Sequence, residues 1–164
     1  MPIRKFDIER FSVTSSKPFE TVVAALKGGV GRLDLAEFGK VSRSQGTFAQ
    51  LEDVINRDMG KTGLMLFVEF DHGAVLRKET GLDAPKIVRL VIGNPLFMKE
   101  MAKHVPDAGT YAPVTVLVDE RSDGVHLSYD KMASFLAPYG NPDALKVAQE
   151  LDLKVENLLN KAAA

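Results

Sequence analysis

Residues 93–129 constrain the fold more than any other part of this chain. A strand ends at Gly93-Asn94-Pro95, a helix follows, and a second strand, 113–120, turns tightly into a third strand, 125–129. Gly124 supplies the turn with a residue that tolerates a positive φ, which is typical of a hairpin between antiparallel strands. Because the predicted strands neither alternate strictly with helices nor stand apart from them, the pattern indicates an α+β fold.

The length and charge of the chain exclude several classes of protein. Its 164 residues suffice for one hydrophobic core, so we expect a single domain over residues 1–164. Its 21 basic and 22 acidic residues give a net charge of -1 and no reason to expect nucleic-acid binding. No apolar run approaches the roughly 20 residues of a membrane helix, and the first residues lack the apolar core of a signal peptide. We therefore expect a cytoplasmic protein without a membrane segment.

Capping residues mark where the helices begin. Ser15-Ser16 can cap a first helix, Thr47 and Gln50 form a capping box, and Gly81 can close the helix that Asp71 caps. We predict helices after Pro18, Thr47, Asp71, Asn94 and Asn141. The apolar pattern weakens over residues 30–46, which we interpret as a surface insertion with a short helix around 33–38.

The predicted first strand shows a break in its alternation. Phe6 and Ile8 share one face of a strand, whereas Phe11 and Val13 would share the other. A β-bulge between the two pairs would reconcile them. Residues 64–70 are apolar on both faces apart from Glu69, which predicts a central strand.

Four segments of the second half of the chain occur together in a specific order and spacing. They are Phe70-Asp71-His72, Ile92-Gly93-Asn94-Pro95, Ala112-Pro113-Val114-Thr115-Val116-Leu117-Val118-Asp119-Glu120 and Asp123-Gly124-Val125-His126-Leu127-Ser128-Tyr129. Over residues 64–140 the chain thereby resembles the family known as domain of unknown function 302. The resemblance implies a mainly antiparallel sheet with helices packed on one face, a fold like that of the TATA-binding protein, and a homodimer, with no settled activity. Val118 departs from the family pattern, which has an aromatic residue there, so no ligand role of that strand is carried over.

Asp71, His72 and Asn94 are the candidate ligand-binding residues. Asp71 and His72 are the only adjacent acid and imidazole, and they follow a buried strand where it reaches the surface. The amide of Asn94, at a strand-to-helix junction, could hold a ligand carbonyl or phosphate. A structural explanation competes with both, because Asp71 and Asn94 can also cap helices, and Gly140-Asn141-Pro142 repeats the junction tripeptide.

Three functions from different classes fit these residues. The first is a small-molecule-binding module with a partly apolar pocket between sheet and helices and with Asp71, His72 and Asn94 at one polar opening. The second is an enzyme in which His72 takes a proton and Asp71 orients it. The third is a homodimeric structural or partner-binding protein. Met98 and Met101, with Phe97, could line an adaptable apolar pocket or could simply belong to the core.

The sequence predicts no metal site and leaves any cofactor unknown. His72, His104 and His126 are scattered, and the chain has no cysteine. Asp119-Glu120 lies at a hairpin rim, where carboxylates are usually solvated. Two segments partly resemble phosphate-binding loops, Gly29-Val30-Gly31 and Gly60-Lys61-Thr62, but each follows a predicted helix instead of a strand.

Overall fold

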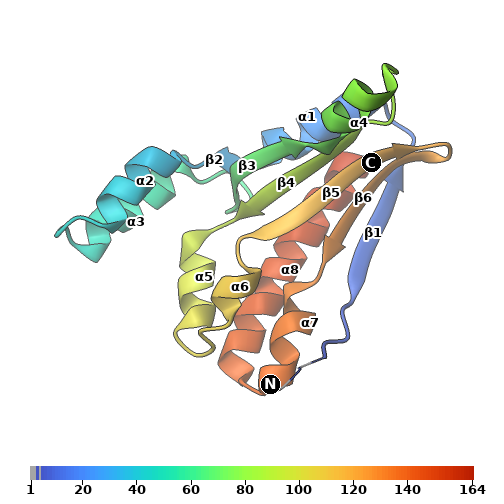
Figure 1. Ribbon diagram of the computed structural model, residues 1–164. Coiled ribbons are helices and arrows are strands. Elements are labelled where there is room, and N and C mark those ends of the chain that lie inside the picture. Colours follow the sequence, from blue (N-terminus) through green and yellow to red (C-terminus); the bar gives the residue numbers. More distant parts are fainter. Residues whose placement is uncertain (1–2, 4) are drawn as a thin grey trace.

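Six strands form one sheet in the computed structural model, which describes residue 3 and residues 5–164 (Figure 1). The strands are β1 (Arg10–Ser15), β2 (Gly31–Arg32), β3 (Met65–Asp71), β4 (Ile87–Gly93), β5 (Val114–Arg121) and β6 (Gly124–Asp130). Their order across the sheet is β1-β6-β5-β4-β3-β2, and β2 and β3 alone among these neighbours run parallel. The predicted α+β class with a mainly antiparallel sheet is confirmed, and the arrangement is consistent with the TATA-binding-protein-like fold.

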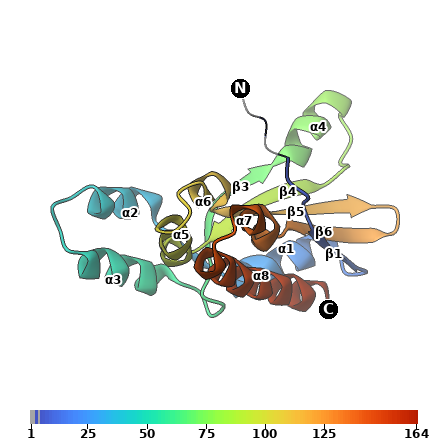
Figure 2. The same ribbon diagram turned by 90° about the horizontal axis from the view of Figure 1, so that it is seen from below.

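Two of the helices, α1 (Phe19–Gly29) and α8 (Pro142–Ala163), cover one face of the sheet (Figure 2). The other helices are α2 (Leu35–Ser42), α3 (Phe48–Asp58), α4 (His72–Thr80), α5 (Pro95–Ala102), α6 (Ala108–Tyr111), α7 (Met132–Leu136) and the 3-10 helix η1 (Ala137–Tyr139). Figure 2 shows α1 and α8 side by side beneath the sheet. Alternate strand residues such as Leu90, Val116 and Leu127 meet Leu26 and Val155 of these two helices in the main core. As the resemblance implied, helices pack on one face.

Most of the predicted caps are present. Thr47 and Gln50 form the complete capping box, and the side chains of Asp71 and Asn141 accept from N–H groups of their own first turns. The helix α1 is the exception, because Ser15 Oγ donates instead to the carbonyl of Ala163, 2.7 Å away. The predicted serine cap of this helix is therefore wrong.

The strand β1 is regular. It pairs with β6 without interruption from Arg10 opposite Asp130 to Ser15 opposite Val125. Phe6 precedes the strand, and its ring centroid lies 6.0 Å from that of Tyr111. The predicted bulge in this strand is wrong because the two apolar pairs belong to different segments. The strand β3 is also less central than predicted, since its second half is exposed beyond the two-residue β2.

The helices α2 and α3 form a hairpin that projects from one end of the sheet (Figure 1). Its inner side has a separate apolar cluster around Leu33, Ile55 and Met65. The short helix predicted around residues 33–38 is present as α2, which begins two residues later because Asp34 is its N-cap, and which extends to Ser42. The interpretation of residues 30–46 as an insertion and of the chain as one domain both remain predictions.

Two glycines form the base of this hairpin. The N–H groups of Gly31 and Gly60 both donate to the carbonyl of Leu64, at 2.9 and 3.2 Å. A Cβ atom on Gly31 would lie 1.8 Å from the carbonyl oxygen of Asp58, and one on Gly60 would lie 2.2 Å from the backbone nitrogen of Gly31. The two backbones touch so closely that neither position accepts a side chain without displacement.

Helices suited to crossing a membrane do not occur in the part of the chain that the structure describes. The cytoplasmic location stays a prediction.

Candidate functional site

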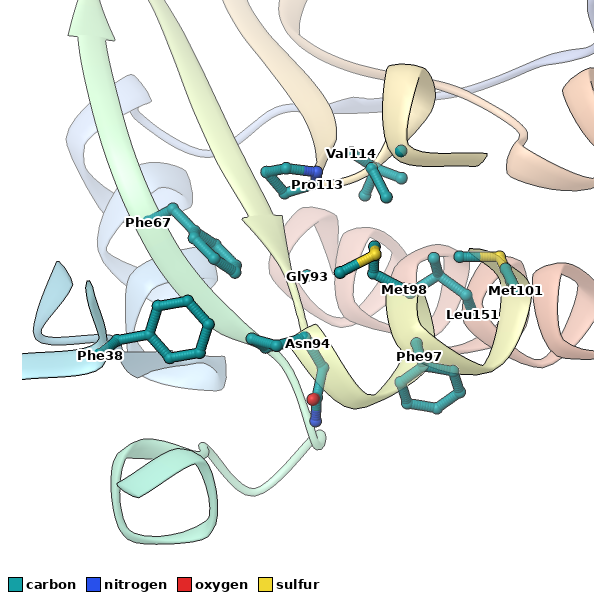
Figure 3. A pocket seen from close by; sticks show the side chains of 13 residues that line it. Phe38, Phe67, Gly93, Asn94, Phe97, Met98, Met101, Pro113, Val114 and Leu151 are labelled. Atoms are coloured by element: carbon teal, nitrogen blue, oxygen red, sulfur yellow. The ribbon is translucent and has the colours of Figure 1, made fainter. Parts of the chain in front are cut away.

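An apolar cavity of about 290 Å³ lies where the ends of β3, β4 and β5 meet α5 (Figure 3). Its lining includes the rings of Phe38, Phe67 and Phe97, the thioethers of Met98 and Met101, and Leu151 of α8. Among the described lining residues, Asn94 is the only one with a polar side chain. Met98 lines the cavity, whereas Met101 both lines the cavity and belongs to the main core.

A β-bulge turns Phe67 toward the cavity. The register of β3 against β4 passes from Leu66 opposite Ile92 to Val68 opposite Val91, which leaves Phe67 as the extra residue. A bulge re-aims side chains in this way. Gly93 adds space, because a Cβ atom there would lie 3.8 Å from the ring of Phe67. The pattern of the apolar run 64–70 gave no signal of this bulge.

The side chain of Asn94 is committed to the protein itself. It is buried, with 6% of its surface exposed, and its Oδ1 accepts from the N–H of Leu96 at 2.8 Å. Its Nδ2 donates to the carbonyl of Gly63 at 2.9 Å and lies 3.3 Å from the sulfur of Met59. Figure 3 shows this amide turned away from the ring of Phe67. Asn94 thus fixes α5 to the loop before β3 and leaves the cavity apolar.

Asp71 and His72 lie at the other end of the sheet. Asp71 is opposite Val88 near the start of β4, whereas Asn94 follows the end of β4. About six residues of extended strand, roughly 20 Å, separate the two positions. The single opening expected for the three residues is therefore wrong, because the ends of antiparallel neighbours point in opposite directions.

Local contacts occupy the side chain of Asp71. It accepts from the N–H of Ala74 at 2.8 Å and forms an ion pair with Arg77 at 2.9 Å. The backbone hydrogen bond, followed by the guanidinium, holds the pKa of Asp71 below its ordinary value. His72 is exposed and stacks on Phe70, with 6.1 Å between the ring centroids. Ligand binding and acid–base chemistry by Asp71 and His72 remain predictions.

The hairpin rim differs from the expectation. Asp119, predicted to be solvated, is 8% exposed and accepts from Arg121 Nε at 2.5 Å. His126 lies 2.8 Å from Asp123, and this contact lowers the pKa of that carboxyl. In residues 3 and 5–164, no three histidine, aspartate or glutamate side chains converge as metal ligands would.

Asp152 of α8 is a buried carboxylate that the sequence analysis did not single out. It is 3% exposed and accepts from the hydroxyl of Tyr129 at 2.7 Å and from the N–H groups of Met132 and Ala133 at 2.7 and 3.1 Å. Burial raises the pKa of Asp152, while these donors act in the opposite direction. The carboxylate of Asp152 thereby caps the N-terminus of α7, although Asp152 lies 20 residues from Met132 in the sequence. The available signal was a charged residue at an apolar position of the helix, three residues before the buried Val155.

Comparisons with known proteins agree with this fold. The search of curated proteins found no match. The crystal structure of an uncharacterized conserved protein DUF302 from Bacillus stearothermophilus is similar, with a TM-score of 0.64 at 15% sequence identity. The similarity covers 93% of this chain and 97% of that chain. The family model described as domain of unknown function DUF302 matches residues 39–162. Because this match spans most of the sequence, the chain belongs to the DUF302 family, as the four sequence segments predicted.

Proposed function

We propose that this chain is a small-molecule-binding protein and that its site is the cavity beside α5. The observation that carries the proposal is the lining, which is apolar apart from an asparagine whose amide points elsewhere. The volume of about 290 Å³ is close to the lower end of the range of small-molecule pockets, about 300–1,000 Å³. An apolar body is the suitable occupant, because a buried polar group without a partner costs roughly 2–7 kcal/mol.

The cavity walls come from several different elements. Met98 and Met101 have unbranched, polarizable side chains that adapt to ligands of different shape. Phe38 reaches the cavity from α2, a helix without fully buried residues. These features support a site that accommodates several related apolar molecules.

Native mass spectrometry of gently purified protein tests this proposal. We expect a copurifying apolar molecule in the wild-type chain and its loss in Met98→Trp, because the larger indole fills part of the cavity. The control is Leu153→Trp, which adds the same group at a position of α8 that is 60% exposed. The natural chain has no tryptophan, so either variant also gives a single fluorescence reporter. An empty wild-type chain without a thermal shift across a panel of apolar compounds would contradict the proposal.

Association of two copies is a second candidate function. Apolar side chains are exposed at the corner of β3 and α4, with Phe70 45%, Val75 70% and Leu82 66% accessible. Exposed apolar patches of this kind commonly mark interaction sites. Light scattering is expected to give a dimer mass for the wild-type chain and a monomer mass for Val75→Lys. A monomeric wild-type chain, or a dimer that Val75→Lys leaves unchanged, argues against this interface.

A further inference from the structure

Arg89 lies in the middle of β4 on the face of the sheet opposite α1 and α8. It is exposed and stands across from Phe70 on β3 and from Leu117 on β5. Its neighbours Val88 and Leu90 are buried in the main core, so the alternation of the strand directs Arg89 to the other face. Within the described residues, its guanidinium has no hydrogen bond or ion pair.

Two depressions adjoin Arg89, of about 190 and 220 Å³. Hydroxyl groups of Thr115 and Ser128 lie among their lining residues. Arg10 also lines one of them, but its guanidinium binds Asp130 through two hydrogen bonds of 2.6 and 2.9 Å. Asp130 lines both depressions beside Arg89, but each of its two carboxylate oxygens accepts from Arg10. Arg10, Asp130 and Arg89 together therefore carry one net positive charge.

The depression beside Arg89 adjoins the apolar cavity. Pro113 and Val114 line both of them. Gly93 of the cavity is four residues from Arg89 along β4, so both face the same side of the sheet at a Cα separation of about 13 Å. A ligand with its apolar body in the cavity needs to extend about 13 Å along β4 to place an anionic group beside the guanidinium.

We propose that the ligand of this cavity is an amphipathic monoanion, an apolar chain or ring with one carboxylate, and that Arg89 binds the carboxylate. The planar guanidinium matches the two oxygens of a carboxylate, and Thr115 offers a further hydroxyl donor. One uncompensated charge suits a carboxylate better than a doubly charged phosphate. The inference rests on the proposed function, because Arg89 supplies only the polar half of the site.

Calorimetric titration with decanoate and with decan-1-ol, both below the concentrations at which they aggregate, tests the inference. We expect Arg89→Gln to weaken decanoate binding about tenfold or more, since hydrogen bonds to charged groups are among the stronger ones. Decan-1-ol affinity should not change. Arg43→Gln, which removes an exposed arginine that follows α2, is the matched control and should bind both compounds as the wild type does.

The outcomes separate the two proposals. Equal decanoate affinity of the wild type and Arg89→Gln, with decan-1-ol still bound, overturns the role of Arg89 and leaves the cavity proposal intact. Tighter binding of decyl phosphate than of decanoate overturns the choice of a carboxylate. If the wild type binds neither decanoate nor decan-1-ol, both proposals fail. Arg89→Lys, which keeps the charge without the planar fork, should recover part of the affinity, and circular dichroism confirms that each variant is folded.

Discussion

The helices α5 and α8 begin at the proline of the same tripeptide, Gly-Asn-Pro, and each is capped by the asparagine of that tripeptide. Asn94 accepts a hydrogen bond from Leu96 at 2.8 Å, and Asn141 accepts one from Ala144 at 2.9 Å. In both helices proline occupies the first turn, where its missing N–H costs nothing. The role of each asparagine side-chain oxygen as a helix cap can therefore be predicted from the local sequence alone.

The two asparagines differ in the use of their donor half. Asn94 is buried and donates to Gly63, which is 31 residues away in the sequence. Asn141 is half-buried, and the bond that holds it is its cap. The same tripeptide is thus a simple helix start in α8 and a cross-link beside the cavity in α5. The difference teaches that a local motif predicts its local role, whereas its second role depends on which distant segment packs against it.

Replacing Asn94 with alanine should have the largest effect. The variant loses the cap of α5 and leaves the carbonyl of Gly63 without its donor. The two losses together should lower the free energy of unfolding by about 2–4 kcal/mol. Urea denaturation at neutral pH measures this change, and a loss no greater than that of Asn141→Ala would break the comparison.

Aspartate at each position separates the two halves of the asparagine. Asn94→Asp keeps the cap acceptor but removes the donor to Gly63, so we expect a loss of about 1–3 kcal/mol. Asn141→Asp should stay within about 0.5 kcal/mol of the wild type, because aspartate caps helices as well as asparagine does. Equal losses in parallel urea titrations would show that the bond to Gly63 contributes nothing to stability.

Asn141→Ala should have a smaller effect than Asn94→Ala. This variant removes a cap and nothing else that the structure describes, so the free energy of unfolding should fall by about 1 kcal/mol. Thermal unfolding should show the same two-state transition at a slightly lower temperature. A loss as large as that of Asn94→Ala would indicate an additional role for Asn141.

Asp71 is a helix cap that carries a charge, and its replacement by asparagine should change the free energy of unfolding least. The pKa of Asp71 in the folded protein lies below the ordinary value of 3.8. The ionised carboxylate therefore contributes fully to the free energy of unfolding above pH 3.8, and this contribution is lost as the pH falls through the folded pKa. Its side chain is 46% exposed, so solvent screening limits the effect of Asp71→Asn to a few tenths of a kcal/mol at pH 7. The difference between wild type and variant should shrink from pH 7 to pH 3, and one independent of pH would contradict this account.

The sequence predicted the features that depend on a few adjacent residues. The capping box at Thr47, the cap at Asp71 and the left-handed Gly81 after α4 are all present, because each is fixed by contacts within one helical turn. The hairpin with Gly124 in its turn could be predicted for the same reason.

Features that depend on long-range packing were missed or misplaced. The bulge at Phe67 and the remote cap from Asp152 arise from segments that meet only after folding. The grouping of Asp71 with Asn94 failed although an antiparallel sheet was predicted, because the sequence did not show that β3 and β4 are direct antiparallel neighbours. The position of Phe38 in the cavity wall could not be predicted, because it depends on how the projecting hairpin packs against the end of the sheet.

The contact between Gly31 and Gly60 closes the projecting hairpin at its root, where the chain leaves the sheet and returns to it at a single backbone crossing. We expect substitutions to be tolerated best at the exposed tip, residues 43–46, and least at this crossing and at the buried Leu33 and Ile55. A protein of this shape can change one wall of its cavity without rebuilding the sheet.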